Sequence, residues 1–218
     1  MNKKGMLVII SGPSGSGKGT VVKQLNRKDF ALSISMTTRK PRAGELNGKD
    51  YLFCTKEEFV KIRESGGFLE HAEFVGNMYG TPKEYVKNQV NEGKAVILEI
   101  DVVGALQVKE KFEDSISIFL IPPSISDLYS RLKGRKTEDD ATIIRRIKRA
   151  KSEIEYMQKY DYIVINDDIN EAVQKLHTII DSEYLKPSRN QNFINKILGD
   201  DFDVTTVLFG TNEQIERN

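Results

Sequence analysis

The sequence predicts an α/β fold in which helices cover both faces of a parallel sheet, and two observations support this. The first is a set of apolar runs without polar alternation, the pattern of strands buried on both faces. The second is that helical patterns separate these runs, because strands that alternate with helices form parallel sheets. The runs are Leu7–Ile10, Ala95–Ile100, Ile116–Ile121 and Tyr162–Ile165. The helical patterns are Thr20–Leu25, Val103–Phe112, Ser126–Leu132, about Ala141–Tyr160 and Glu171–Tyr184.

Two stretches depart from this alternation. Residues 35–82 contain strand-like pieces around a helical pattern at 56–65, so we expect an α+β insertion there. The strand-like pieces are 50–53 and 68–74. Residues 131–146 are dense in charge and Gly134 interrupts their helical pattern, which predicts a second, smaller insertion.

The predicted domain spans residues 1–185 and is followed by a C-terminal extension, 186–218, whose role the sequence leaves open. The segments of the domain core are 5–34 and 83–185. Pro187–Asn190 is typical of a helix stop, and the weak alternation of Phe202–Phe209 is compatible with a strand. A folded annex, an oligomer contact and a disordered tail all fit this extension.

Composition narrows the class of protein. The 218 residues include 33 Lys and Arg against 32 Asp and Glu, a balance that gives no general attraction to nucleic acid or membranes. Cys54 is the single cysteine, so no internal disulfide can form, and no metal-type cysteine spacing exists. No apolar run approaches the length of a membrane span. We therefore expect a cytoplasmic protein that acts on small molecules.

A glycine-rich loop joins the first strand to the first helix. Its residues are Gly12, Pro13, Ser14, Gly15, Ser16, Gly17, Lys18, Gly19 and Thr20. Their order and context match the phosphate-binding pattern G-x-x-x-x-G-K-[ST], in which backbone N–H groups surround an anion at a helix N-terminus. Lys18 would reach the β- and γ-phosphates of ATP as a point charge. The loop predicts a P-loop NTPase-type sheet; a strand–turn–helix junction without a ligand is the less favoured alternative.

One position departs from this pattern. The residue after Lys18 is Gly19, and the first hydroxyl follows at Thr20. Because water and phosphate oxygens can fill most of a Mg²⁺ shell, we expect Mg²⁺ to be held mainly through them. Thr20 and Asp101 are the candidate protein ligands.

A second candidate anion site follows in the chain. Arg39 and Arg42 lie three residues apart beside the hydroxyls of Ser35, Thr37 and Thr38. Guanidinium groups bind phosphate through two parallel hydrogen bonds, and hydroxyls can complete the set. A solvated basic loop fits the same residues, so this segment alone does not settle the ligand.

Several motifs together resemble the guanylate kinase family over about residues 5–185. They are Ser11-Gly12-Pro13-Ser14-Gly15, Thr37-Thr38-Arg39-Lys40-Pro41-Arg42, Gly48-Lys49-Asp50-Tyr51, Asn77-Met78-Tyr79-Gly80-Thr81, Glu99-Ile100-Asp101 and Asn166-Asp167-Asp168. The resemblance implies that the insertion at 35–82 binds GMP and that 131–146 form a lid.

The resemblance also implies a role for each acceptor-site residue. The GMP phosphate would be held by Arg39, Arg42, Tyr51 and Tyr79, and guanine would be read by Ser35, Glu70 and Thr81. The chemistry fits, because a carboxylate such as Glu70 can accept hydrogen bonds from N1–H and N2–H₂ of guanine, and the hydroxyl of Thr81 can donate to O6. Adenine lacks this set of groups, and a site built on paired polar groups rejects such an analogue strongly.

Two acids end the second buried strand. Glu99 and Asp101 lie at the sheet edge where α/β proteins bind ligands. The resemblance implies that Asp101 lies near the phosphates and Mg²⁺ waters and that both acids lie near GMP. A helix cap is the alternative for Asp101.

A basic stretch follows the third strand. Such runs usually form a solvated helix face, and we expect this of Arg145, Lys148 and Arg149. The resemblance implies different roles for four residues of this region and beyond. Arg135 and Arg146 would be lid arginines, Arg131 would lie near the ATP phosphates, and Asn166 would lie beside adenine.

The implied activity is in-line transfer of the γ-phosphate of ATP to GMP in purine nucleotide metabolism, with Mg²⁺. The groups expected to take part in catalysis are Lys18, Arg39, Arg135, Arg146 and Asp101. Two alternatives stand beside it: another nucleoside monophosphate kinase, and a guanylate-kinase-like peptide-binding module, a class that tends to lose the loop lysine and lid arginines. The sequence does not decide between a monomer and a homo-oligomer.

Overall fold

The computed structural model describes residues 4–74, 76–134, 139–200 and 202. The chain forms two compact units, Met1–Ser182 and Glu183–Asn218.

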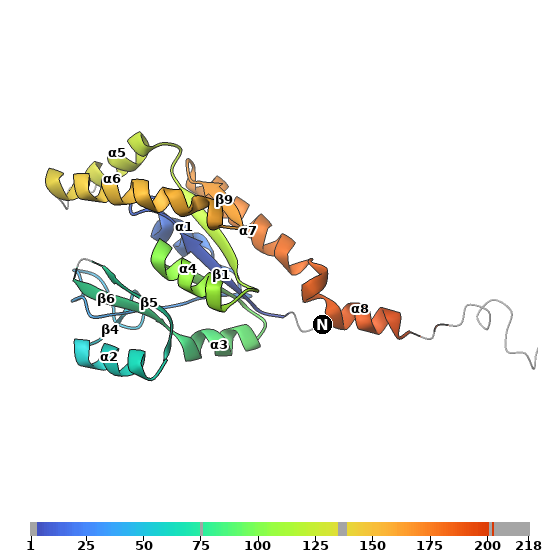
Figure 1. The fold of residues 1–218 in the computed structure, drawn as a ribbon. Helices are drawn as coiled ribbons and strands as arrows, with labels where there is room; N and C mark the ends of the chain where they lie inside the picture. Colours follow the sequence, from blue (N-terminus) through green and yellow to red (C-terminus); the bar gives the residue numbers. More distant parts are fainter. Residues whose placement is uncertain (1–3, 75, 135–138, 201, 203–218) are drawn as a thin grey trace, which may run out of the picture. The chain divides into compact units, whose positions relative to one another are not determined.

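The first unit is built on a five-stranded sheet in the order β2-β7-β1-β8-β9 (Figure 1). Its strands are β1 (Met6–Ser11), β2 (Phe30–Leu32), β7 (Ala95–Glu99), β8 (Ile116–Ile121) and β9 (Tyr162–Ile165). All four neighbouring pairs are parallel. The predicted α/β class is confirmed. The edge strand β2 was not predicted, because three residues are too few to show a periodic pattern.

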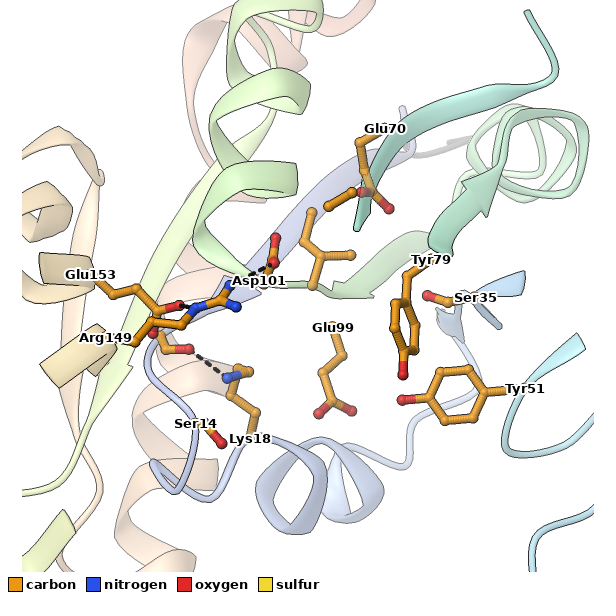
Figure 2. Close-up of a pocket in the computed structure, with 13 residues that line it drawn as sticks. Ser14, Lys18, Ser35, Tyr51, Glu70, Tyr79, Glu99, Asp101, Arg149 and Glu153 are labelled. Atoms are coloured by element: carbon orange, nitrogen blue, oxygen red, sulfur yellow. Dashed lines mark hydrogen bonds and ion pairs between the residues drawn. The ribbon is translucent and has the colours of Figure 1, made fainter. Parts of the chain in front are cut away.

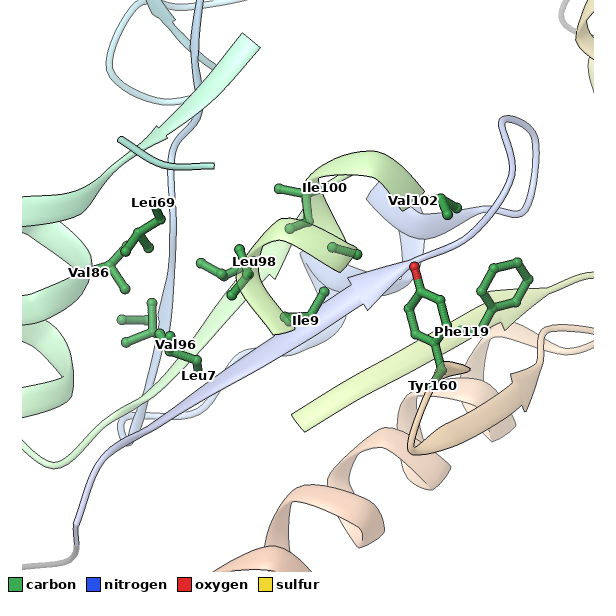
Figure 3. Close-up of a cluster of buried hydrophobic side chains, with 13 residues drawn as sticks. Leu7, Ile9, Leu69, Val86, Val96, Leu98, Ile100, Val102, Phe119 and Tyr160 are labelled. Atoms are coloured by element: carbon green, nitrogen blue, oxygen red, sulfur yellow. The ribbon is translucent and has the colours of Figure 1, made fainter. Parts of the chain in front are cut away.

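The central strands of this sheet are buried on both faces, which explains why they lack polar alternation. Edge strand β9 differs, because its Ile163 and Ile165 are exposed. Leu7 and Ile9 of β1 belong to one cluster with Val96 and Leu98 of β7, and helix α4 (Val102–Lys111) packs on that face (Figure 3). Residues that point to the opposite face are equally buried; they include Val8, Ile10, Ile97, Ile118 and Leu120.

The remaining helices of this unit lie between the strands, except for the last one, which follows β9. They are α1 (Lys18–Gln24), α3 (Lys83–Asn91), α5 (Ile125–Gly134), α6 (Asp140–Ile154) with a 3₁₀ turn at Glu155–Lys159, and α7 (Ile169–Tyr184). The helix predicted at 141–160 is therefore two pieces, with the change at Ile154. Helix α3 was not predicted. Its apolar residues are few, and Val86 alone is buried among them.

Residues 36–82 form a second sheet in the order β4-β3-β6-β5. Its strands are β3 (Met36–Thr37), β4 (Leu52–Phe53), β5 (Phe68–Phe74) and β6 (Asn77–Pro82), with helix α2 (Lys56–Glu64) beside them. A capping box fixes the start of α2, since Thr55 and Glu58 satisfy each other's backbone N–H groups. In Figure 1 this small sheet and helix α6 lie on opposite sides of α1 and α4.

Helix α5 ends at Gly134, and Asp139 caps the N-terminus of α6 by accepting a 2.7 Å hydrogen bond from the Thr142 N–H. Most of the lid predicted at 131–146 belongs to these two helices. Residues 135–138, including the predicted lid residue Arg135, lie outside the described residues.

In the second unit a 3₁₀ turn (Pro187–Arg189) precedes helix α8 (Gln191–Leu198). The amide of Asn190 donates to the carbonyl groups of Tyr184 and Lys186, at 2.8 and 2.9 Å, and so closes the preceding helix end. Helix α8 was not predicted. The strand suggested at 202–209 lies, apart from Phe202, outside the described residues. No described helix of either unit is long and apolar enough to cross a membrane.

Candidate active site

The glycine-rich loop wraps around the side chain of its own lysine. The ammonium group of Lys18 donates to the carbonyl oxygens of Gly12, at 2.5 Å, and Pro13, at 3.3 Å (Figure 2). Gly12 and Gly17 have φ angles of 144° and 91°, which favour glycine. A Cβ at position 12 would collide with the Leu120 carbonyl oxygen. The loop conformation thus depends on glycine, and it leaves a cation at the N-terminus of α1.

Three side chains from later segments hold this loop in place. The amide of Asn166 donates to the Ser16 carbonyl oxygen at 2.8 Å, and Arg131 donates to the Asn166 carbonyl oxygen at 2.7 Å. Arg146 on α6 donates to the Ser14 hydroxyl at 3.3 Å. The structure therefore gathers Arg131, Arg146 and Asn166 at the loop.

The carboxylate of Glu99 lies next to Gly19, the position at which the loop departs from the usual phosphate-binding pattern. A Cβ at position 19 would lie 3.3 Å from Oε1 of Glu99, which is tighter than ordinary carbon–oxygen contact. Burial raises the pKa of Glu99, and the positive charges of Lys18 and Lys23 oppose this rise. Glycine at position 19 thus leaves room for the carboxylate at the end of β7.

The acceptor side begins with an arginine that is already paired. Arg39 forms two parallel hydrogen bonds with the Glu45 carboxylate, both 2.9 Å long. This pair holds the pKa of Arg39 above its usual value and that of Glu45 below it. The guanidinium group also lies 5.2 Å from the centre of the Tyr51 ring, which meets the Tyr79 ring edge to face at 6.1 Å. Arg42 is exposed beside this group.

Deeper in the same region lies a buried carboxyl group. Glu70 on β5 is 4% exposed, and the hydroxyl of Thr81 on β6 donates to its Oε1 at 2.6 Å. Burial raises the pKa of Glu70 to about 7, and the charge of Asp101 adds to the rise. Oε2 lies 2.5 Å from where a Cβ of residue 104 would be, so Gly104 on α4 makes room for this carboxyl group.

Asp101 links the acceptor side to α6. Its Oδ1 accepts a hydrogen bond from the Gly104 N–H at 2.9 Å, which caps α4. Its Oδ2 pairs with Arg149 of α6 at 3.3 Å. The helix cap considered for Asp101 is therefore present, together with a second contact that the sequence did not predict.

Most of these groups line two neighbouring cavities, whereas Arg131, Asn166, Glu45 and Thr81 line neither of them. One is lined by Gly12, Lys18, Ser35, Glu70, Asp101 and Arg149, among others. The other is lined by Gly17, Thr20, Arg39, Arg42 and Arg146, among others. Both cavities are also lined by Ser14, Lys18, Tyr51, Tyr79 and Glu99. A continuous polar cleft therefore runs from the loop to the buried Glu70 (Figure 2).

The model of one protein family, guanylate kinase, matches residues 4–183. The chain belongs to the guanylate kinase family. Among curated relatives, the guanylate kinase of Caldanaerobacter subterraneus is 50% identical over 199 residues, covering 90% of this chain and 97% of that protein. The guanylate kinase of Oceanobacillus iheyensis is also 50% identical, over 202 residues, covering 92% of this chain and 98% of that protein.

A solved guanylate kinase has the same fold. The crystal structure of guanylate kinase from Anaplasma phagocytophilum aligns with a TM-score of 0.73 at 30% identity. The alignment covers 97% of this chain and 98% of that one. The chain therefore resembles guanylate kinases over nearly its whole length.

Three residues outside the predicted set shape the cleft of this family member. Glu45 holds Arg39, Gly104 makes room for Glu70, and Arg149, expected on a solvated face, lines the cleft instead. Arg145 and Lys148 are exposed as expected. The i, i+3 spacing of Arg146 and Arg149 was the available signal, since it places both side chains on one helix face.

The described carboxylates offer few ligands for a metal ion. No group of three or more Asp, Glu, His or Cys residues in the described part of the chain is arranged to hold one. Glu99, Asp101 and Thr20 are among the residues with side-chain oxygens that line the cleft. This sparse set fits Mg²⁺, which keeps several waters and binds through phosphates with one or two carboxylates.

Proposed function

We propose that this guanylate kinase family member transfers the γ-phosphate of ATP to GMP, producing ADP and GDP. One observation carries the proposal: Lys18 of the phosphate loop and the buried Glu70 line the same cavity. A cation suited to ATP phosphates thus faces the same space as a carboxyl group suited to guanine. We also propose a cytoplasmic location, which the unpaired Cys54 supports.

The proposed donor site is the glycine-rich loop. Backbone N–H groups at the start of α1 and the ammonium group of Lys18 would bind the ATP phosphates. Arg131 and Arg146 already contact this loop, and both guanidinium groups would stabilise the charge that develops on the transferred phosphoryl group. The family resemblance alone suggests that Arg135 would act with them. Asn166 supports the loop and would lie beside adenine.

The proposed acceptor site lies at the other end of the cleft. Glu70 would accept hydrogen bonds from the N1–H and N2–H₂ groups of guanine when it is ionised. Thr81 donates its single hydroxyl proton to Glu70 in this structure, so it must turn before it can donate to O6. Ser35 lines the same cavity and would contact the base.

The phosphate of GMP would bind at the outer part of this site. Arg39 and Arg42 supply guanidinium groups, and Tyr51 and Tyr79 supply hydroxyls that line both cavities. Burial raises the pKa of Tyr51, so its hydroxyl stays a hydrogen-bond donor at neutral pH. Glu99 and Asp101 would border the same nucleotide.

These positions support direct in-line transfer, with no covalent enzyme intermediate. Acceptor-site side chains orient the GMP phosphate oxygen toward the γ-phosphorus, while Lys18 and the arginines of α5 and α6 neutralise developing charge. A bound Mg²⁺ would supply further neutralisation of the phosphates, held mainly through their oxygens and water, with Thr20 or Asp101 as candidate protein ligands.

The test is ADP release from ATP and Mg²⁺ with GMP, AMP, CMP, UMP or dTMP as acceptor. We expect turnover with GMP alone, and its loss in Lys18→Ala protein that keeps the wild-type circular dichroism spectrum. Turnover with another monophosphate would identify a different nucleoside monophosphate kinase and overturn the base site. Folded protein that turns over none of them would favour a binding module.

A further inference from the structure

Helix α6 presents one polar edge to the cleft. Arg146, Arg149 and Glu153 are spaced i, i+3 and i+7, so their side chains lie on the same face of the helix. Arg146 reaches the phosphate loop at Ser14, and Arg149 reaches Asp101 at the end of β7. A single helix therefore contacts both the proposed donor site and the proposed acceptor site.

Arg149 is held from both sides. Its Nε donates to Glu153 Oε1 at 2.6 Å, and its Nη2 donates to Asp101 Oδ2 at 3.3 Å, so the guanidinium plane lies between two carboxylates (Figure 2). Glu153 is 13% exposed, which leaves Arg149 little freedom to turn away. The rigid fork of arginine suits such a bridge, whereas a lysine ammonium could not span it in the same geometry.

Because of its contact with Arg149, both carboxylate oxygens of Asp101 have a hydrogen-bond partner. Oδ1 is held by the Gly104 N–H, and Oδ2 is held by Arg149, so partners on two different elements determine the rotation of the carboxylate. Each carboxylate oxygen has a second lone pair, and the remaining ones are available to a ligand in the cavity that Asp101 lines.

The Arg149–Glu153 pair also separates two spaces. Both residues line the cavity that contains Lys18 and Glu70, and both line a groove between α4 and α6 beside Val103 and Tyr156. The pair thus forms part of the wall between the acceptor cavity and the outer surface of the protein.

We propose that Arg149 is a positioning residue for the acceptor nucleotide: it orients Asp101 toward the acceptor cavity and joins α6 to that cavity's wall. This inference rests on the proposed function. The Arg149–Asp101 pair is about one-third exposed, and ion pairs of that kind contribute little to folding stability. Loss of Arg149 should therefore change the binding of GMP rather than the stability of the protein.

The experiment compares Arg149→Met with Lys148→Met, which removes an exposed positive charge from the neighbouring helix position. We expect Arg149→Met to raise the KM for GMP roughly tenfold, with the KM for ATP and the Tm nearly unchanged. Arg149→Lys should recover part of this loss, and Lys148→Met should match the wild type. Glu153→Gln should raise the KM for GMP by a smaller factor, roughly threefold.

A double-mutant cycle with Asp101→Asn locates the effect. If Arg149 acts through Asp101, its replacement should change the KM for GMP little in the Asp101→Asn background. Equal effects in both backgrounds, an unchanged KM for GMP, or a loss confined to kcat would each overturn the inference. A wild-type protein that does not phosphorylate GMP would instead refute the proposed function, and this inference with it.

Discussion

The two ends of the cleft are built in different ways. The phosphate loop is local: one strand, nine consecutive residues and one helix form it, and glycine backbone geometry gives it its shape. The acceptor cavity is assembled from side chains in and beside the small sheet, residues at and just after the end of β7, and helix α6. Its carboxylates already have partners, such as Thr81 for Glu70 and Arg149 for Asp101. The loop takes its shape from its own backbone and needs later side chains only as supports, whereas the acceptor cavity should depend on several coupled side chains.

The largest effect should come from the loop. Replacement of Lys18 by Met removes the cation that faces the phosphates without changing the backbone geometry, and we expect kcat to fall about 10³-fold. Steady-state ADP release measures it, with Lys28→Met, an exposed lysine just beyond the same helix, as the control. A Lys18→Met protein that retains a tenth of the wild-type kcat would show that the loop backbone alone suffices.

Next in size is the loss of the buried carboxyl group. Glu70→Gln puts an amide donor where guanine also has donors, so we expect kcat/KM for GMP to fall at least about 10²-fold. The KM for ATP should stay near the wild-type value. Glu73→Gln, at an exposed position of the same strand, is the matched control. Equal losses in the two variants would mean that Glu70 has no special role in binding the base.

Gly104→Ala tests whether the acceptor cavity depends on the space that Gly104 leaves for the Glu70 carboxyl group. The added Cβ would lie 2.5 Å from Oε2 of Glu70, so the carboxyl group must move. Alanine favours the helix by about 1 kcal/mol over glycine, and the variant should stay folded. We expect the KM for GMP to rise roughly tenfold. Val103→Ala, at the exposed neighbouring position, should leave the KM unchanged.

The last expected effect is on stability without nucleotides and does not involve the reaction itself. The folded-state pKa of Glu70 is raised to about 7, above the unfolded value of 4.5, so the folded protein binds more protons between these pH values. The free energy of unfolding should therefore fall as pH rises from about 4.5 to 7, by at most about 3 kcal/mol, and then level off. Glu70→Gln lacks this loss, so its Tm relative to the wild type should increase between pH 5 and pH 8. Parallel pH profiles of the two proteins would contradict the raised pKa.

The contrast between the two ends also explains what the sequence could predict. The loop and four of the five parallel strands were readable because each depends on residues close together in the chain. The role of Arg149 depends on Asp101, which is 48 residues away in the chain and is brought close by folding. Glu45 is six residues from its partner Arg39, but that spacing alone does not indicate an ion pair. The role of Gly104 could not be predicted for a different reason, because it consists of the space that this residue leaves for Glu70.

Short elements account for part of the remaining differences. Strands β2 and β3 have three and two residues, and pairing with neighbours rather than local pattern stabilises them. The six-residue strand β6 was also not predicted. Helix α8 had a usable signal, since apolar residues recur at Phe193, Ile194, Ile197 and Leu198 with helical spacing. The preceding Pro187 indicates the end of one helix but carries no signal for α8, which follows it.

The pairing of Arg39 with Glu45 has a consequence for ionic strength. An incoming phosphate group meets a guanidinium that already has an anionic partner, so its binding there exchanges one anion for another. The number of small counterions released to the solvent is then lower than the number of arginines suggests. The affinity of this site for a phosphate group should therefore weaken less with added salt than that of a site with two solvated arginines.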